Sequence, residues 1–403
     1  MDLGPRLGLG PRGRQRLTSQ RVDDLRSPER PGPVPDAGRV GLLLGLVGLV
    51  AFGGPAAHVA LMRRLVVERE GWLDSAEFNR MFAACNLIPG PSSTELAMFI
   101  GYRLAGRRGL LVAAVTFIAP AFFAMLALAA LYERYAGSRG MGLVLHGVRP
   151  VVVAILAWAA IDLARKGLGD RRLLLLAPPA LGLYLLGVNP VFALAACGLA
   201  GLGIAAVWSG RINLAVTAFL AGPHPERLLP LFATFLKIGA ISYGSGYVLF
   251  AYLDSDFVKG LGWLRPEQLV DAVAAGQVTP GPVFTTATFL GYLFAGLPGA
   301  VLATVGIFLP GLLMVPLLAR FLRLVERRPA LRASLDAVNA AVIGLVAAVL
   351  LEVGRAALVD PLTVLIAGVA LPVIWWRPLA APALVAAAAL AGLASGATGL
   401  NLA

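Results

Sequence analysis

The chain has 403 residues, of which 58% are hydrophobic and only 14% carry a charged side chain, and its formal net charge is +12. A soluble domain carries roughly 25% charged residues, so the composition excludes an ordinary water-soluble protein and predicts one that folds in a membrane. The basic residues are mostly arginines of the N-terminal tail and short loops. This pattern is typical of membrane topology and does not favour nucleic acid as a partner.

The chain begins with a segment of a different kind. Residues 1–38 are rich in Arg, Gly and Pro and lack the apolar core of a signal peptide. Such a segment cannot bury enough apolar surface to fold alone. We expect residues 1–38 to form a disordered tail.

After the tail, apolar segments long enough, or nearly long enough, to cross roughly 30 Å of hydrocarbon follow one another. In the first part of the chain they begin near Val40, Phe78, Gly109, Met141, Arg172 and Asn189, and in the second part near Leu228, Gln268, Leu297, Ala333, Pro361 and Pro378. Unpaired backbone groups are costly in lipid, and the segments lack the alternation of barrel strands. The predicted fold class is therefore an all-α polytopic membrane protein.

The two parts of the chain repeat one pattern of short motifs. The first part holds G-W-L at 71–73, N-L-I-P-G-P at 86–91 and G-Y at 101–102; the second holds G-W-L at 262–264, Q-V-T-P-G-P at 277–282 and G-Y at 291–292. Gene duplication explains this better than chance. We expect two homologous halves, residues 39–208 and 229–403, joined by a surface linker at 209–228.

Loop charges indicate how the halves are oriented. Arg103, Arg107 and Arg108 follow the second segment, whereas the matching loop at 293–299 has no charge, and the imbalance reverses in the next loop. This alternation favours an inverted repeat. Inversion requires an odd number of crossings per half, so a P-G-P segment or its neighbour should not fully span. The arginine-rich tail argues against inversion, because it would then lie outside.

Each P-G-P sequence predicts a break inside an apolar segment. Proline lacks a backbone donor and clashes with helical geometry, so the helix must stop and restart. The hydroxyl residues that follow could cap the restarted helix. Because such helix ends attract anions, we expect two of them, one per half, to converge on a substrate anion near the midplane. The alternative is that P-G-P only kinks two packed helices. The candidate substrate-binding residues are Asn86, Pro89, Gly90, Pro91, Ser92, Ser93, Thr94, Lys237, Gln277, Thr279, Pro280, Gly281, Pro282, Thr285 and Thr286.

Three ionisable residues in apolar surroundings are further candidates. Lys237 could neutralise a bound oxyanion or pair with Glu95, or it could extend to the membrane surface. Glu95 would repel an anion, so we assign it to proton coupling or pairing, against simple complementation of the helix dipole. His58 could titrate near neutrality, or serve as a hydrogen-bonded packing group.

Other features give weaker or negative indications. The glycines of F-G-G-P at 52–55 and Y-G-S-G at 243–246 favour close helix packing over a second break. Arg149 and other polar residues of later segments are expected near helix ends, outside the pathway. Two isolated cysteines and three scattered histidines indicate no disulfide framework, metal centre, cofactor or enzyme active site. The chain has no phosphate-binding loop for ATP hydrolysis.

Five stretches resemble the chromate ion transporter (CHR) family in its long, two-domain bacterial form, over roughly residues 40–400. They are F-G-G-P-A-A-H at 52–58, E-R-E-G-W-L at 68–73, the first P-G-P block at 86–106, F-L-K-I-G-A-I-S-Y-G-S-G-Y at 235–247 and the second P-G-P block at 276–296. The resemblance implies a multi-pass secondary transporter of the bacterial cytoplasmic (inner) membrane that exports chromate. Its motif positions include Phe52, Gly53, Gly54, Pro55, His58, Lys237, Gly244 and the residues of both P-G-P motifs.

The sequence leaves several alternatives open. Sulfate is a tetrahedral dianion like chromate, and a site of helix ends and hydroxyls would discriminate weakly between the two. A passive anion channel would need a continuous pore instead of an alternating site. A homodimer is also left open. This chain has Asn86 where relatives often have glutamine and Ser245 where they often have glycine, which bears on the substrate more than on the fold.

Overall fold

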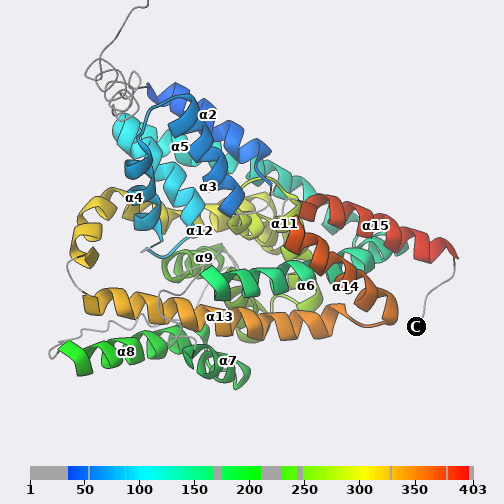
Figure 1. Ribbon diagram of the computed structural model, residues 1–403. Helices are drawn as coiled ribbons and strands as arrows, with labels where there is room; N and C mark the ends of the chain where they lie inside the picture. The colour runs from blue at the N-terminus through cyan, green and yellow to red at the C-terminus, as the bar shows by residue number, and fades with distance from the viewer. Residues whose placement is uncertain are drawn as a thin grey trace, which may run out of the picture.

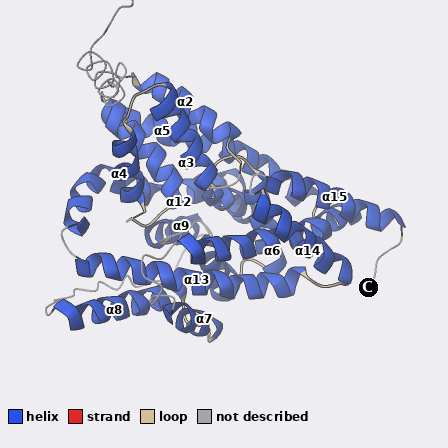
Figure 2. Ribbon diagram, viewed as in Figure 1, coloured by secondary structure: helices blue, strands red, loops and turns tan. Residues whose placement is uncertain are grey.

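The computed structural model describes residues 35–52, 55–86, 88–166, 175–209, 228–242, 248–326, 329–377 and 380–398. Every regular element in these ranges is a helix (Figure 2), which confirms the all-α prediction. Almost all of the expected tail lies outside the described residues, although helix α2 already begins at Ala37. The expected linker also lies outside them, except at its two ends.

The helices of the two halves correspond in order. The first half contains α2 (Ala37–Val50), α3 (Pro55–Arg63), the π-helix η1 (Arg64–Arg69), α4 (Ser75–Cys85), α5 (Ser92–Tyr135), α6 (Arg139–Lys166), α7 (Ala177–Leu185) and α8 (Pro190–Ser209). The second contains α9 (Leu228–Ile241), α10 (Val248–Leu253), the π-helix η3 (Asp254–Gly260), α11 (Pro266–Val278), the 3-10 turn η4 (Val283–Thr285), α12 (Thr286–Glu326), α13 (Pro329–Ala357), α14 (Pro361–Trp376) and α15 (Ala381–Thr398). Among the described residues, α5, α6, α12 and α13 are long and apolar enough to cross a membrane.

Helix α5 is in fact a helical hairpin, and so is α12. Ala105 and Gly106 have non-helical backbone angles, with a φ of 62° at Gly106, and they separate a short arm (residues 92–104) from a long arm (residues 107–135). The same turn recurs in α12, where Gly296 has a φ of 61°. A Cβ on Gly101 would collide with the carbonyl oxygen of Gly109. The glycine of the G-Y motif therefore allows the backbones of the two arms to touch.

Helix α4 and the short arm of α5 form a re-entrant hairpin, which we call the second hairpin of the first half. Glu77, at the start of α4, lies 2.6 Å from Arg103, at the end of the short arm. The chain thus runs along α4, reverses at the P-G-P tip and returns along the short arm. The start of α4 and the end of the short arm therefore lie side by side. In the second half, the ring centroids of Trp263, just before α11, and Phe294, at the end of the short arm of α12, are 5.5 Å apart.

A first hairpin precedes the second in each half. Helix α2 ends at Val50 and α3 restarts at Pro55. The start of α2 lies beside the end of η1, since Arg39 contacts Glu70 at 3.4 Å. In the second half, Lys237 of α9 contacts Asp256 of η3 at 2.7 Å. Residues 53–54, which precede α3 in the sequence, and residues 243–247, which precede α10, lie outside the described residues.

These hairpins bear on two expectations. The F-G-G-P sequence was expected to serve helix packing, but the helix ends there, because Pro55 removes a backbone donor and α3 must begin anew. The P-G-P segment was expected to stop and restart a helix, and it does. The two pieces fold back on each other, as expected of a P-G-P segment that does not fully span. The tight Ala-Gly turn at 105–106 then sends the chain into the long arm.

The two halves are interleaved. Helix α13 of the second half packs on α7 and α8 of the first, and α6 of the first half packs on α14 and α15 of the second (Figure 1). Two buried apolar clusters form the core. One joins the hairpins of the first half to Val315 and Leu318 of α12, and the other joins the hairpins of the second half to α6, α7 and α8.

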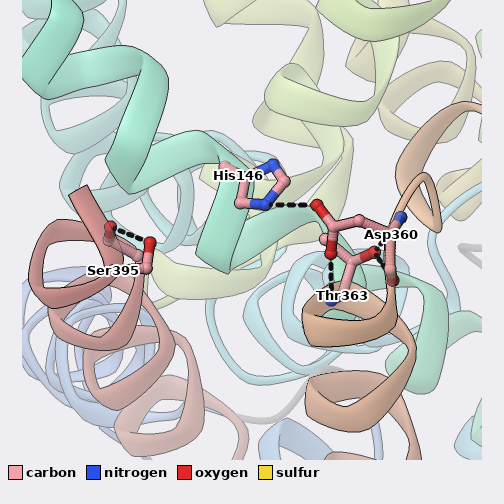
Figure 3. Close-up of polar contacts among 5 residues, drawn as sticks. His146, Asp360, Thr363 and Ser395 are labelled. Atoms are coloured by element: carbon pink, nitrogen blue, oxygen red, sulfur yellow. Dashed lines mark hydrogen bonds and ion pairs between the residues drawn. The ribbon is translucent and has the colours of Figure 1, made fainter. Parts of the chain in front are cut away.

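One polar contact across this interface also begins a helix. The imidazole Nε2 of His146, in α6, lies 2.8 Å from the carboxylate of Asp360. Asp360 is the N-cap of α14 and accepts a hydrogen bond of 2.8 Å from the backbone N–H of Thr363 (Figure 3). A single carboxylate therefore starts α14 and fixes it to the first half.

Replacing this carboxylate should lower the stability of the protein, because two interactions are lost. Asp360→Ala removes both the cap and the contact with His146, and we expect it to cost about 1 kcal/mol for the cap alone. Asp360→Asn retains a good N-cap and should lose less. The measurement is the thermal unfolding midpoint of the purified protein in detergent. Equal midpoints for the two variants would show that capping contributes little.

Candidate functional site

The tips of the hairpins bind one another across the two halves. The N–H of Gly90 donates to the carbonyl oxygen of Ser242 at 2.6 Å, and the N–H of Gly281 donates to the carbonyl oxygen of Ala51 at 3.2 Å. Gly90 and Gly281 occupy equivalent positions in the repeat, and so do Ala51 and Ser242. The same hydrogen bond is therefore made twice, and it gathers four tips in one region between the halves.

Both tip glycines adopt backbone conformations that require glycine. Gly90 has a φ of 133° and Gly281 a φ of 93°. A Cβ on Gly281 would lie 2.8 Å from Cβ of Ala121 in the long arm of α5, and a Cβ on Gly90 would collide with the carboxylate of Glu95. The central residue of each P-G-P motif is thus fixed by its backbone angle and by lack of space.

Glu95 is fully buried next to the first P-G-P tip. Neither carboxylate oxygen has a hydrogen-bond partner among the described residues. A Cβ on Gly311 would lie 3.3 Å from one of these oxygens, so the carboxyl group sits between the tip and the long arm of α12. A buried carboxylate without a partner is costly, which makes Glu95 a candidate for protonation.

His58 joins the two hairpins of the first half. Its Nε2 lies 3.1 Å from the carbonyl oxygen of Ala51, and its Nδ1 lies 3.1 Å from Oγ of Ser93. A carbonyl only accepts, so Nε2 carries the hydrogen and Nδ1 of the neutral ring accepts from the Ser93 hydroxyl. The ring also meets Phe117 edge-on, with centroids 5.4 Å apart. The carbonyl oxygen of Ala51 thus accepts hydrogen bonds from both His58 Nε2 and the N–H of Gly281.

Buried polar atoms without partners gather at the tips. Among the described residues, the buried side-chain atoms without a hydrogen-bond partner are both Glu95 carboxylate oxygens, Thr94 Oγ1, Ser242 Oγ, Gln277 Nε2 and Asp256 Oδ2. All of them except Asp256 Oδ2 belong to residues close to the tips in the sequence. Thr94 follows the first P-G-P tip, Ser242 follows α9, and Gln277 precedes the second tip. Buried polar groups normally have partners. The cluster at the tips is therefore suited to a polar ligand.

The expected helix caps are not formed. The N-cap position of α5 is Pro91, and no side chain caps the helix. In the second half, the hydroxyls of Thr285 and Thr286 donate to the carbonyl oxygens of Pro282 and Val283, at 2.7 and 2.8 Å. The prediction of hydroxyl capping was wrong, because a proline occupies the capping position and the hydroxyls bond back to the preceding turn.

Two candidates lie apart from the buried cluster. The Lys237 side chain is 43% exposed and forms its ion pair with Asp256, so the expected alternative of pairing with Glu95 was wrong. Asn86 is exposed at the end of α4, whereas its counterpart Gln277 is buried. The amides preceding the two P-G-P motifs therefore have different surroundings.

One ionic cluster was missed from the sequence. Asp271 of α11 is buried and accepts two hydrogen bonds from Arg149 of α6, at 2.7 and 2.9 Å. Tyr132, near the end of the long arm of α5, donates to the same carboxylate at 2.9 Å. Arg149 was expected outside the pathway, but it is bound to a hairpin that carries a P-G-P tip. The signal was an aspartate within the apolar α11 segment.

Long apolar helices and paired re-entrant hairpins define a polytopic helical membrane protein made of two homologous halves. The chain belongs to the chromate transporter family. The sequence profile described as "Chromate transporter" matches residues 39–202 and again residues 229–393. These two matches confirm both the resemblance and the internal repeat, and they place the chain among transporters and not enzymes.

Several curated proteins are similar along most of their length. The chromate transport protein of Cupriavidus metallidurans is 34% identical over 372 residues, which cover 86% of this chain and 90% of the relative. That of Pseudomonas aeruginosa is 32% identical, covering 86% and 89%. The probable chromate transport protein of Synechococcus elongatus is 31% identical, covering 86% and 92%. No solved structure gives a significant match.

The tip geometry predicts a marked effect of one methyl group. Gly281→Ala would press a side chain against Ala121 and force a left-handed φ on alanine, which should cost about 1–3 kcal/mol. Gly354→Ala is the control, because a Cβ there meets nothing within 4 Å. Thermal unfolding in detergent should show a lower midpoint only for Gly281→Ala. Unchanged midpoints in both variants would contradict the described tip.

Proposed function

We propose that the chain is a secondary active transporter that exports chromate across the bacterial cytoplasmic membrane, with its substrate site at the meeting tips. Relatives named chromate transport proteins support the substrate. The observation that carries the site is the reciprocal pair of hydrogen bonds, Gly90 to Ser242 and Gly281 to Ala51, in a region of unpartnered polar atoms.

Contacts along the long arm of α5 support an inverted arrangement of the halves. The arm begins at the base of the second hairpin of its own half. Near its middle, Ala121 faces the tip at Gly281. Near its end, Tyr132 binds Asp271 at 2.9 Å, on the opposite hairpin of the other half. The P-G-P hairpins therefore approach the tips from opposite ends of one long helix, as alternating access from two faces requires.

Substrate binding and tip separation are linked in this proposal. The N–H groups of Gly90 and Gly281 already donate to carbonyls of the other half, so an anion that takes these donors must replace Ser242 and Ala51. The amide of Gln277 and the hydroxyls of Thr94 and Ser242 are the unpartnered donors nearby. A doubly charged tetrahedral ion has enough acceptor oxygens to bind several of them, and helix N-termini favour its charge.

Glu95 supplies the coupling to protons. An ionised Glu95 beside the first tip would repel a dianion, and protonation removes that repulsion. A proton on Glu95 and an anion at the tips therefore favour each other's binding, so the two move together. The complex keeps one net negative charge, which an inside-negative membrane potential drives outward. His58 keeps the neighbouring tip in place through Ala51 and Ser93.

Glu95→Gln tests this coupling while keeping the shape of the side chain. In proteoliposomes, an imposed pH gradient should drive uphill accumulation of chromate by the wild-type protein, and the variant should show no response to the gradient. Glu68→Gln is the matched control, because the Glu68 side chain is 61% exposed and lies in η1.

The same assay separates the alternatives. A passive channel would only dissipate a chromate gradient, so absence of uphill transport by the wild-type protein would overturn the proposal. Sulfate has the same charge and shape, and the unpartnered donors contain no group that singles out chromate. Accumulation of sulfate in place of chromate would reassign the substrate without changing the mechanism.

Gln277→Ala should weaken substrate binding without unfolding the protein. A hydrogen bond to a charged group contributes about 1.5–3 kcal/mol, so the KM for chromate should rise at least about tenfold. Asn86→Ala is the comparison, because Asn86 occupies the position equivalent to Gln277 but is exposed. Initial transport rates at varied chromate concentration give both KM values. Equal increases would contradict a site centred on the buried amide.

A further inference from the structure

A basic pocket lies at the base of the second hairpin of the first half, away from the tips. Its volume is about 640 Å³, and its lining includes Glu77, Arg80, Phe99, Tyr102, Arg103 and Arg107. Glu77 and Arg80 come from α4, and Phe99 and Tyr102 from the short arm of α5. The pocket therefore opens between the two arms of the hairpin that carries Pro89, Gly90 and Pro91.

Two of its three arginines have no acidic partner among the described residues. Arg103 is bound to Glu77 at 2.6 Å. Arg80 and Arg107 are exposed and form no ion pair there. The ion pair cancels its own charge, so the pocket presents two uncompensated positive charges. That is the charge needed to neutralise a tetrahedral dianion, and guanidinium groups match its oxygens by paired hydrogen bonds.

The pocket is lined by the helix that begins at the first P-G-P tip. Phe99 lines it, and Ser92 begins the same helix at the tip. Seven residues of α-helix span roughly 10 Å. Along the helix axis, an anion beside Phe99 would thus be separated from the P-G-P break by about half the length of the short arm.

The second half does not carry this pocket's charge. The positions equivalent to Arg80, Arg103 and Arg107 are Asp271, Leu293 and Leu297. Asp271 is itself held by Arg149 and Tyr132 of the first half. The basic pocket is therefore not a by-product of the duplicated fold. Where one hairpin base presents free arginines, the other presents a carboxylate that is already paired.

We propose that Arg80 and Arg107 form an entry site for the oxyanion at one face of the membrane, from which the ion passes to the tips. This inference rests on the proposed function. Loops rich in arginine face the cytoplasm, so the entry site lies on the side from which an exporter collects its substrate. Clefts of one charge sign also raise the local concentration of counter-ions and their association rate.

The test uses a double variant, Arg80→Gln with Arg107→Gln. Its matched control is Arg64→Gln with Arg108→Gln, which removes the same charge from exposed arginines of the same half that do not line the pocket. The first measurement is equilibrium binding of radiolabelled chromate and of sulfate to the purified protein in detergent at low salt. The second is the initial transport rate in vesicles of phosphatidylcholine alone.

The pocket variant should bind chromate about tenfold more weakly, and its KM for transport should rise about tenfold. Its maximal transport rate should be unchanged, because the variant loses electrostatic attraction for the anion but keeps the site at the tips. The control should stay within about twofold of wild type. High salt should reduce the difference in chromate affinity and KM between the pocket variant and the control variant, since salt screens the interactions of exposed charges.

Other outcomes would overturn the entry site. Equal losses in the pocket variant and the control would assign the effect to general surface charge. A loss that appears only in vesicles containing phosphatidylglycerol would assign the arginines to a lipid phosphate. If the wild-type protein bound chromate through these arginines but never accumulated it uphill, the entry site would stand and the proposed transport function would fail.

Discussion

The structure depends on two backbone hydrogen bonds exchanged between the halves, from Gly90 to Ser242 and from Gly281 to Ala51. Prolines at the tips break the helices and leave peptide groups without partners in their own helix. Inside a membrane these groups must find partners in protein. Each half supplies the partner that the other lacks, so neither half could present its tips to the bilayer alone. The fold therefore requires two such units in contact.

The repeat keeps its geometry where its charges have changed. Arg63 and Glu68 of the first half lie 3.9 Å apart, and their equivalents Asp254 and Lys259 lie 2.8 Å apart with the signs exchanged. Each pair joins the start of a π-helix to a residue near its end. The backbone is held by glycine turns and tip contacts, and the side chains around it have diverged freely. One hairpin base therefore carries a basic pocket, whereas the equivalent base in the second half carries Asp271, paired with Arg149.

The sequence was sufficient to predict helices, the repeat and the breaks at P-G-P, because proline and glycine act locally. It could not predict that the pieces on either side of a break would fold back, since that depends on contacts such as Glu77 with Arg103. Burial of Glu95 against Gly311 likewise depends on the other half. Asp271 could have been found, because a carboxylate within an apolar segment is costly without a partner.

The contact between Gly101 and Gly109 has a mechanical consequence. Two backbones that touch directly have no flexible side chain between them to absorb a displacement, so the two arms of α5 behave as one stiff lever. Its short end is the tip beside Glu95, and its far end is Tyr132, attached to Asp271 on the opposite hairpin. A rearrangement of the first tip would therefore be transmitted to the contact between Tyr132 and Asp271.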